Sequence, residues 1–597
     1  MTFATPLRDM RFALRHMADF GALAGAYPDL SDDLTDAILE EAGKFCDNVL
    51  APLNWTSDRQ GAVLENGVVR TTPGFDGAYR QYVDGGWNAL AFPAEDEGLD
   101  IGGQGLPSTL AVALVDAMNA SCMSFAIGTT LTTGAVKALL HAGTPDQKRR
   151  FLPKLVSGEW TGTMNLTEPQ AGSDLSDMRT KAEPIGDGRY KISGQKIYIT
   201  YGDHDLTDNI VHLVLARLPD APAGTGGISM FLVPKVHVDE AGAVGARNDV
   251  QCVGLEEKMG LHGSPTCVMA YGEAGDCVGE LLGAENKGLR NMFVMMNSAR
   301  LDVGVQGVGV AERAYQHALA YALERRQGRA PGVKSGDQIA IFEHPDVRRM
   351  LYAMKAATEA SRGICYANAV AYDRARHGES ADERAKARAL EDLLTPISKA
   401  WSTDRAIETA SYGVQVHGGM GYVEETGAAQ FARDVRIAAI YEGTNGIQAM
   451  DLVGRKLQAD GGAAARDFID AARETAGALQ SSGDPGLAVA GARLEQASDA
   501  LAASTDWLLA RAAAAPDDVL AGATPYLKQF GNVAGGHYLG RGALSVRAEG
   551  DASYASAKAG LTHFYAETFL AEAAGLTPTV CAGAAAVEKR DPALLSA

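Results

Sequence analysis

Hydrophobic residues recur every three or four positions along most of this chain, and that spacing predicts amphipathic helices. Near the N-terminus, for example, Leu7, Met10 and Leu14 form an apolar stripe with arginines between them. The same spacing, bounded by Pro and Gly, recurs through much of the sequence. We predict helices over residues 6–58, 74–85, 108–119, 124–141, 145–155, 288–327, 344–376, 381–412, 447–458, 464–479, 486–513, 517–547 and 552–574.

Residues 161–282 follow a different pattern. Short runs such as 161–167, 195–200 and 210–217 alternate between hydrophobic and polar residues, and Gly, Pro and Asp separate them. A period of two predicts strands, so this region indicates a small all-β domain. Helical, β and again helical parts in that order predict an α+β multidomain protein.

These changes of pattern set the predicted domain boundaries. We predict an N-terminal helical domain with an extension (1–160), a middle β domain (161–282), a helical bundle domain (283–460) and an additional C-terminal helical domain (461–597). A glycine pair and an Ala-rich composition mark the last boundary. At 597 residues the chain is also too long for a single hydrophobic core.

Composition narrows the classes of function. A net charge of −20 disfavours a general nucleic-acid role, because such proteins carry an excess of Lys and Arg. The sequence shows neither an unbroken apolar run long enough to predict a membrane span nor the apolar segment of a secretory signal. The seven cysteines are scattered without the spacing of metal ligands, which predicts free thiols and no metal site. We expect a cytoplasmic protein.

One candidate catalytic residue is Glu442, which lies between an apolar run and a helical pattern that begins near Ile447. Asn445 and Gln448 have the spacing of a helix N-cap and its reciprocal partner. Glu442 should therefore project from a turn just before a helix N-terminus. With Gly443 beside it to admit a substrate, it is a candidate general base. The alternative is an ordinary solvated turn glutamate.

Two stretches of the β region could hold a flat or polar ligand. The loop 166–174 contains Pro, Gly and Ser173, which expose backbone N–H groups and a hydroxyl. In the strand 195–200, Tyr198 and Thr200 fall on one face. The alternative for the first stretch is a plain loop. The alternative for the second is a cross-strand core pair.

Two stretches of the later helical region could bind phosphate or another ligand edge. Arginines occur in 297–300 and 325–327, and Arg suits bidentate phosphate binding, although surface salt bridges are the alternative. Three glycines within 415–422 would let a ligand approach closely. Because no strand precedes them in a βαβ unit and the sequence has no P-loop, nicotinamide and ATP are disfavoured.

Taken in this order, the stretches resemble the acyl-CoA dehydrogenase family of flavoenzymes over residues 75–457. The likeness is carried by three segments: Leu166–Asp174, Gln415–Tyr422 followed by Arg433 and Asp434, and Tyr441–Thr444. Gln430 and Tyr198 depart from it, since the family usually has a basic residue at the first position and often Trp at the second. Some members place the base just before the arginine matched by Arg300. That position here is Ala299, which cannot abstract a proton, so Glu442 remains the candidate base.

The resemblance implies a helical N-terminal domain, a middle β-barrel and a C-terminal helical bundle, with FAD bound between the last two. It implies flavin contacts from Leu166, Thr167, Ser173, Tyr198, Ile199 and Thr200. It implies that the pyrophosphate and adenosine, partly across a subunit boundary, meet Arg325, Gln327, Gln415, Gly418, Gly419, Thr444 and Gly446. It implies acyl-CoA contacts from Ser173, Asn297, Arg300 and Gly443. Glu442 would take the α-proton while the β-hydrogen leaves as hydride to the flavin.

The extensions at both ends resemble a longer subgroup of the family. That likeness implies a short acyl-CoA substrate, with 3-methylmercaptopropionyl-CoA, an intermediate of dimethylsulfoniopropionate breakdown, the first to test. It also implies an electron-transfer flavoprotein as acceptor and a homodimer or dimer of dimers. A general acyl-CoA dehydrogenase, an acyl-CoA oxidase and a non-catalytic flavin-binding scaffold remain alternatives.

Overall fold

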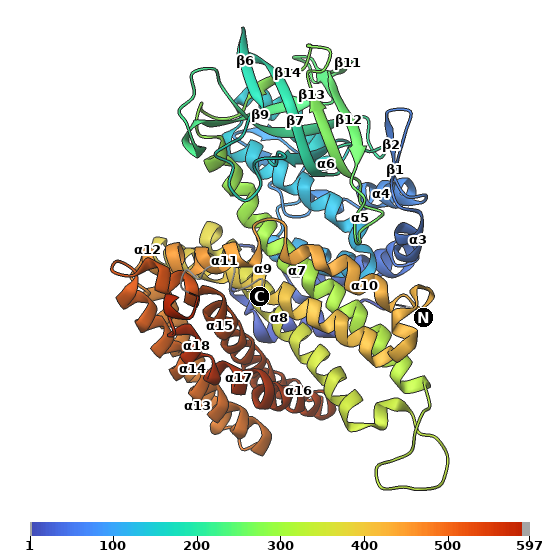
Figure 1. The fold of residues 1–597 in the computed structure, drawn as a ribbon, viewed down its shortest axis with the longest axis vertical. Helices are drawn as coiled ribbons and strands as arrows, with labels where there is room; N and C mark the ends of the chain where they lie inside the picture. The colour runs from blue at the N-terminus through green and yellow to red at the C-terminus, as the bar shows by residue number, and fades with distance from the viewer. Residues whose placement is uncertain (1–2, 588–597) are drawn as a thin grey trace, which may run out of the picture. The chain divides into compact units, whose positions relative to one another are not determined.

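The structure, a computed structural model, describes residues 3–587 of the chain. It divides into two compact units, Ile38–Asp302 and the combination of Met1–Ala37 with Val303–Ala597 (Figure 1). The predicted helical, β and helical regions follow one another along the chain as expected. The helices of the N-terminal extension and of the C-terminal tail belong to the same unit, the second of the two.

Five α-helices precede the eight-stranded sheet in the unit Ile38–Asp302. The sequence predicted separate helices over 108–119 and 124–141, but one helix runs through both, with a kink at Cys122 (φ −155°, ψ 92°). The residues around the kink are buried on every side, so no polar face showed that the helix continues. The helices are α2 (Asp32–Phe45, which spans the limit of the unit), α3 (Leu53–Gln60), α4 (Phe75–Asp84), α5 (Ser108–Ala142) and α6 (Pro145–Ser157).

Within the described residues, α5 is the one helix whose length and composition would allow it to cross a membrane. Its most apolar window has a mean hydropathy of 1.7, but 89% of that window is buried inside the protein. Such burial is that of a core helix in a water-soluble protein. We therefore assign α5 to the hydrophobic core.

A mixed eight-stranded sheet makes the β region. Its strands lie in the order β12–β13–β7–β14–β9–β8–β5, with β6 paired to both β7 and β8. The long strand β7 pairs with β13 through its C-terminal half and with β6 and β14 through its N-terminal half, so the sheet curls into a small barrel. The strands are β5 (Thr161–Asn165), β6 (Lys181–Gly186), β7 (Arg189–Thr200), β8 (Ile210–Arg217), β9 (Ile228–Pro234), β12 (Val250–Leu255), β13 (Thr266–Tyr271) and β14 (Val278–Leu281).

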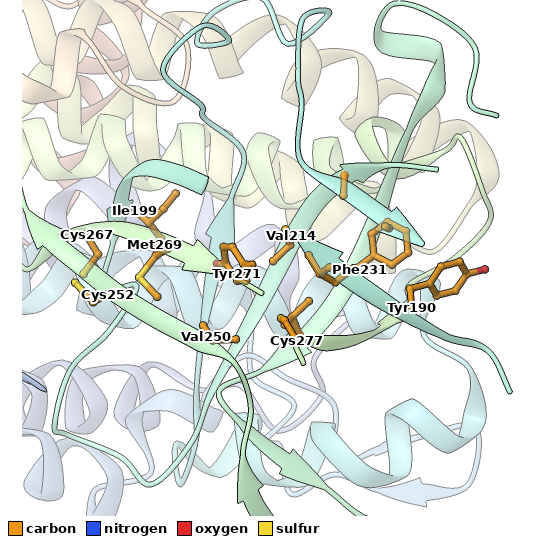
Figure 2. Packing of buried hydrophobic residues seen from close by; sticks show 14 of the residues in the cluster. Tyr190, Ile199, Val214, Phe231, Val250, Cys252, Cys267, Met269, Tyr271 and Cys277 are labelled. Atoms are coloured by element: carbon orange, nitrogen blue, oxygen red, sulfur yellow. The ribbon is translucent and has the colours of Figure 1, made fainter. Parts of the chain in front are cut away.

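Side chains from facing strands fill the interior of this sheet (Figure 2). The rings of Tyr190 and Phe231 meet edge to face with centroids 5.0 Å apart. The buried hydroxyl of Tyr271 donates to Asn165 at 2.7 Å, so it is not left unpaired. Short hairpins flank the sheet: β1 (Val63–Glu65) with β2 (Val68–Arg70), β3 (Glu95–Asp96) with β4 (Leu99–Asp100), and β10 (Val236–Val238) with β11 (Val244–Arg247).

Long helices form the body of the second unit. Small residues let α7 and α9 approach closely: a Cβ on Gly304 would lie 2.4 Å from the Ser398 carbonyl oxygen. The helices of the bundle are α7 (Gly288–Glu324, which begins in the first unit), α8 (Pro345–His377), α9 (Ala381–His417), α10 (Ala428–Val435) and α11 (Asn445–Asp451).

The C-terminal tail and the N-terminal extension both pack on this bundle. Trp401 of α9 donates to Asn532 of α15 at 2.8 Å, and both side chains are buried. Phe12 and Met17 of the extension lie against Gly542 of α15. The elements are α1 (Leu7–Phe12) in the extension, and α13 (Ala463–Gln480), α14 (Pro485–Arg511), α15 (Pro516–Ser545), α16 (Ala552–Tyr565) and α17 (Ala571–Gly575) in the tail.

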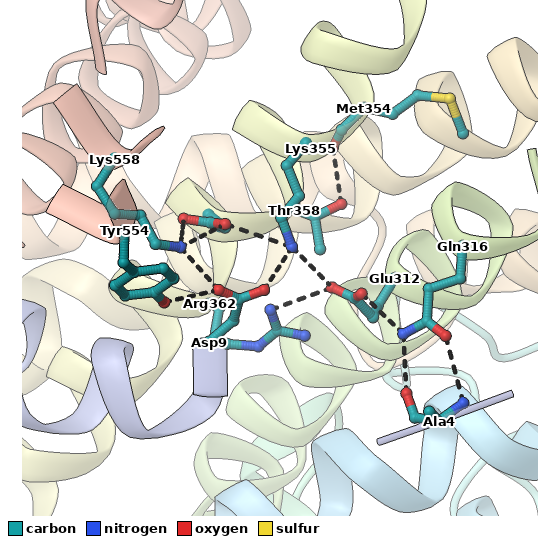
Figure 3. Close-up of polar contacts among 11 residues, drawn as sticks. Ala4, Asp9, Glu312, Gln316, Met354, Lys355, Thr358, Arg362, Tyr554 and Lys558 are labelled. Atoms are coloured by element: carbon teal, nitrogen blue, oxygen red, sulfur yellow. Dashed lines mark hydrogen bonds and ion pairs between the residues drawn. The ribbon is translucent and has the colours of Figure 1, made fainter. Parts of the chain in front are cut away.

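A network of charges joins the extension, the bundle and the tail (Figure 3). Asp9 of α1 accepts hydrogen bonds from Lys355 of α8 at 2.6 Å and from Lys558 of α16 at 2.7 Å. The hydroxyl of Tyr554, also on α16, donates to the same carboxylate at 2.9 Å. Lys558 pairs in turn with the buried Glu359 of α8 at 2.7 Å. The network ties both ends of the chain to its centre.

Candidate functional site

Glu442 lies in a tight turn that leads into α11. Its φ is 55°, in the left-handed region that residues with a side chain rarely adopt, and Gly443 follows with a φ of 82°. Before the turn, the Tyr441 hydroxyl donates to Gln306 of α7. After it, Gln448 donates its amide to the Glu442 carbonyl oxygen at 3.3 Å, instead of capping the helix as predicted. The turn is therefore fixed from both sides.

The predicted N-cap of α11 is wrong by one residue. The cap is Thr444, whose Oγ1 accepts a hydrogen bond from the Ile447 N–H at 3.3 Å. Asn445 instead contacts α9: its Oδ1 accepts from Lys399 at 2.8 Å, and its Nδ2 donates to Asp404 at 2.7 Å. These tertiary partners engage both ends of the Asn445 amide, which leaves none of it for a local cap.

The loop 166–174 is built around Glu168, which the sequence did not single out as functional. Its carboxylate is 3% exposed and accepts from two backbone N–H groups at 2.7 and 3.0 Å. The fully buried Lys196 of β7 donates to that carboxylate at 2.8 Å and to the Leu166 carbonyl oxygen at 3.0 Å. Burial raises the pKa of Glu168, but the Lys196 ammonium and the other donors outweigh it and lower the pKa to about 2. This ion pair fixes the loop to β7.

Tyr198 and Thr200 lie at the end of β7, next to the same loop. The Ile197 N–H donates to the Thr167 carbonyl oxygen at 3.0 Å, which joins strand and loop. Tyr198 has a φ of 61° at a bulge opposite β13 and is 61% exposed, an unusual position for a large aromatic side chain. Ile199 points into the core (Figure 2), so its backbone is the part left for a ligand. On the loop, the predicted Ser173 is exposed.

The first turns of α7 carry Asn297 and Arg300. Arg300 is 4% exposed and donates to the side chain of Asn297 at 3.3 Å. Lys137 of α5 donates to Ser298 at 2.6 Å. Burial raises the pKa of the nearby Asp302 to about 6, against the opposing effect of Lys137. This stretch thus places a buried guanidinium next to an exposed amide.

Another group of predicted residues lies where α7 and α9 end. His417 stacks on Tyr321 of α7 with ring centroids 4.4 Å apart, which holds the turn after α9 against the last turns of α7. At the end of α7, Arg325 donates to Gln327 at 2.8 Å. The exposed residues of this group are Arg325, Gln327, Gln415, Gly418 and Gly419.

The structure does not bring this group together with the Glu442 turn. Asp404, which holds that turn through Asn445, and Gln415 are 11 residues apart on α9. At 1.5 Å per residue, they are about 16 Å apart along the helix. Thr444 and Gly446, by contrast, belong to the Glu442 turn itself.

The surface formed by the end of β7 with the loop 166–174 and the surface at the ends of α7 and α9 fit different parts of a flavin nucleotide. Tyr198 and Thr200 offer an exposed ring and a hydroxyl beside a rigid loop, which suits a flat aromatic group. Gly418 and Gly419 have open space where a Cβ would lie, so their backbone is accessible to a phosphate. Arg325 follows the last turn of α7, on which His417 stacks, and its guanidinium suits a phosphate. The residues therefore suit the cofactor that the sequence implies.

Sequence reasoning missed the charged residues that support these surfaces. Lys196, Glu168 and Lys399 are buried, and their partners are distant in the sequence or belong to another element. A lysine at an otherwise apolar position of a strand or helix was the available signal, because a buried lysine needs a partner.

Four family models match the chain in sequence order. Those described as the N-terminal, middle and C-terminal domains of acyl-CoA dehydrogenase match residues 32–159, 163–272 and 286–457. The fourth, described as an acetyl-CoA dehydrogenase C-terminal-like domain, matches residues 462–590. Together they span the helical, β and helical regions and the tail.

Individual relatives match nearly the whole chain. A 3-methylmercaptopropionyl-CoA dehydrogenase of Ruegeria pomeroyi is 48% identical over 578 residues, which are 96% of this chain and 97% of that protein. A broad-specificity linear acyl-CoA dehydrogenase of Mycobacterium tuberculosis is 32% identical over 581 residues, 92% of each chain. The structure of an acyl-CoA dehydrogenase of Bacillus anthracis complexed with FAD covers 96% of this chain and 91% of its own, with a TM-score of 0.74 at 22% identity. This last likeness shows the fold, including the tail.

Proposed function

The chain belongs to the acyl-CoA dehydrogenase family, and we propose that it oxidises the Cα–Cβ bond of 3-methylmercaptopropionyl-CoA to give 3-methylthioacryloyl-CoA. As a member of this family it is an FAD-dependent oxidoreductase that acts on acyl-CoA thioesters. The observation that carries the substrate is the 48% identity, over almost the full length, to the Ruegeria pomeroyi enzyme of that name. We place the reaction in dimethylsulfoniopropionate breakdown on the same ground.

Glu442 is the general base of this proposal. The α-proton of a thioester is a weak acid, and a free carboxylate has a pKa of about 4.3, so the site must favour proton transfer by desolvation and by hydrogen bonds to the substrate carbonyl. Glu442 is half-buried and held by the Tyr441–Gln306 and Gln448 contacts on either side. The left-handed backbone at Glu442 and Gly443 leaves their N–H groups outside the helix ladder, where they can meet a carbonyl oxygen.

The cofactor contacts divide between the surfaces described above. The rigid loop, Tyr198 and Thr200 would hold the flavin ring, and the group at the ends of α7 and α9 would hold phosphate and adenosine. FAD, when bound, accepts the hydrogen and the electron pair that leave Cβ. Gln415 lies about 16 Å along α9 from Asp404, which holds the Glu442 turn. This separation supports the expectation that part of the second group binds a flavin of another subunit. Ser173, Asn297, Arg300 and Gly443 would bind the acyl-CoA.

Further expectations complete the proposal. An electron-transfer flavoprotein would reoxidise the enzyme, the active form would be a homodimer or a dimer of dimers, and the reaction would take place in the cytoplasm. The limits of the family models support four domains at residues 1–160, 161–282, 283–460 and 461–597.

An anaerobic titration of the FAD-loaded protein with 3-methylmercaptopropionyl-CoA tests the proposal through flavin absorbance. We expect bleaching of the parent, whereas Glu442→Gln should retain FAD but bleach at least about 100-fold more slowly, because it lacks a base. Glu425→Gln, a change at an exposed glutamate of the same domain, is the matched control and should bleach like the parent.

Each outcome of this titration is informative. Unchanged bleaching in Glu442→Gln would show that another residue is the base. Faster bleaching by butyryl-CoA than by the thioether substrate would assign a general short-chain dehydrogenase instead. Rapid peroxide formation in air would indicate an acyl-CoA oxidase, and bound FAD that no acyl-CoA reduces would leave only a binding protein.

A further inference from the structure

A cavity in the second unit shares no residue with the surfaces described so far. Its volume is about 470 Å³, within the range of small-molecule sites. The N-terminal extension contributes Ala18 and Asp19, and the other walls come from α8, α9 and α15. Because three separate parts of the chain line it, the cavity forms only when extension and tail are both docked on the bundle.

Two hydrogen-bond donors of α15 face this cavity without an acceptor. Tyr538 is only 3% exposed, yet among the described residues its hydroxyl makes no hydrogen bond. Arg541 is half-buried and, in the same part of the chain, has neither a hydrogen bond nor an ion pair. Three residues apart on a helix, they lie on one face. In the free protein these donors depend on water, which the oxygens of a bound anion can replace.

The other charges that line the cavity are matched or exposed. Arg374 pairs with Glu383 at 3.0 Å, and Lys386 pairs with Asp382 at 2.9 Å. Asp19 is exposed and solvated, so it needs no further partner. Arg541 is therefore the one cationic side chain of the lining without an ion pair in the described part of the chain, and Asp19 is the one such carboxylate.

We propose that this cavity is a binding site for a small aliphatic monocarboxylate, separate from the dehydrogenation site. The carboxylate would accept hydrogen bonds from Tyr538 and Arg541. The short alkyl chain would lie against the apolar wall that includes the buried Val370 and Ala371 of α8. A single negative charge matches the one unpaired guanidinium, whereas Asp19 and the paired carboxylates at the rim disfavour a dianion such as phosphate.

Binding at this site should stabilise the docked arrangement of all three parts. A ligand that binds only the folded protein raises its stability as the ligand concentration exceeds the dissociation constant. Dissociation of the extension or the tail removes a wall of the cavity, so the ligand opposes both. The stability of the folded enzyme would thus increase with the concentration of a free organic acid.

Calorimetry and thermal unfolding of the FAD-loaded full chain test this with butanoate and 3-methylmercaptopropanoate as probes. Saturating enoyl-CoA product is present throughout, so that the dehydrogenation site is occupied. We expect each acid to bind once per chain and to raise Tm. Arg541→Gln and Tyr538→Phe should each lower the affinity at least tenfold without changing kcat/KM. Arg547→Gln, whose side chain donates to the Ser482 carbonyl oxygen outside the cavity, is the matched control.

The results can also overturn the proposal. Failure of both acids to bind, or binding unaffected in Arg541→Gln and Tyr538→Phe, would show that the cavity holds only water. Binding that appears only in a parallel titration without the enoyl-CoA would assign the acids to the dehydrogenation site. Phosphate binding as tight as butanoate binding would contradict the preference for a monoanion. Asp19→Asn should weaken that preference, because it removes a negative charge and so strengthens phosphate binding.

Discussion

Glu442 adopts a backbone conformation that costs about 1–2 kcal/mol for a residue with a side chain, so neighbouring contacts must maintain it. Asn445 supplies the most extensive of these contacts, because its amide joins the turn to Lys399 and Asp404 in α9. Lys399 is fully buried, and burial raises the pKa of Asp404. The amide therefore bridges two charged side chains of α9.

Replacing Asn445 with Ala should lower kcat about 10- to 100-fold while KM and FAD content change little. The turn would lose its anchor on α9, so Glu442 would spend less time in the reactive position. The loss of these partly buried hydrogen bonds should also reduce the free energy of unfolding by about 1 kcal/mol. Steady-state assays measure kcat and KM, stopped-flow flavin reduction measures the chemical step directly, and Asn48→Ala, at an exposed helical asparagine, is the control. An equal fall in kcat and rise in KM would contradict a positioning role.

The residue scale also shows what local sequence could reveal. Glu442, Tyr198 and the glycines near 418 could be proposed as site residues from the sequence because each lies in a short stretch with its own signal. Lys399 was not, because its partner Asn445 is 46 residues away. Asn445 itself was assigned to a cap because local spacing fits one, and only the tertiary contact with α9 decides otherwise.

At the scale of elements, the loop between β5 and β6 owes its shape to one ion pair. Glu168 accepts two backbone N–H groups of the returning chain and the ammonium of Lys196 in β7. Strand β7 therefore holds the loop in position, and the strand and the loop together form the surface next to Tyr198. A change at Glu168 should therefore disturb the cofactor surface without touching the cofactor.

Glu168→Gln should destabilise the protein by about 3–5 kcal/mol near neutral pH, because it leaves the buried Lys196 ammonium without its counter-charge. The pKa of Glu168 is lowered from 4.5 to about 2 in the folded protein, so its contribution exists above pH 4.5 and disappears as the pH falls toward 2. Chemical unfolding across this range, with FAD retention recorded, measures both effects. Glu183→Gln on exposed β6 is the control. Parallel pH curves for parent and Glu168→Gln would contradict the argument.

The elements themselves were largely readable from the sequence. The spacing of apolar residues gave the long helices α13 and α14 to within a few residues, because each has one buried face. It did not give the continuity of α5, whose middle is buried on every side, nor the bulge at Tyr198 in β7. Both depend on packing against neighbours that a local window does not contain.

At the scale of the whole molecule, Asp9 connects the two ends of the chain with its centre (Figure 3). Its carboxylate lies between Lys355 of the bundle and Lys558 of the tail. Burial raises the pKa of Asp9, but the two ammonium groups outweigh it and hold the pKa far below its ordinary value of 3.8. The sequence could not predict this contact, because Asp9 and Lys558 are 549 positions apart.

Asp9→Asn should lower the free energy of unfolding by about 3 kcal/mol at neutral pH, because two partly buried ammonium groups lose a shared counter-charge. A carboxylate with a lowered pKa stabilises the fold above pH 4 or so and loses that effect as the pH falls, so the difference from the parent should shrink in acid. Hydrogen exchange should show the earliest opening in α1 and α16. The exposed Asp29→Asn is the control. Uniform exchange across the bundle, with α1 and α16 as protected as in the parent, would mean that the network does not hold the ends of the chain.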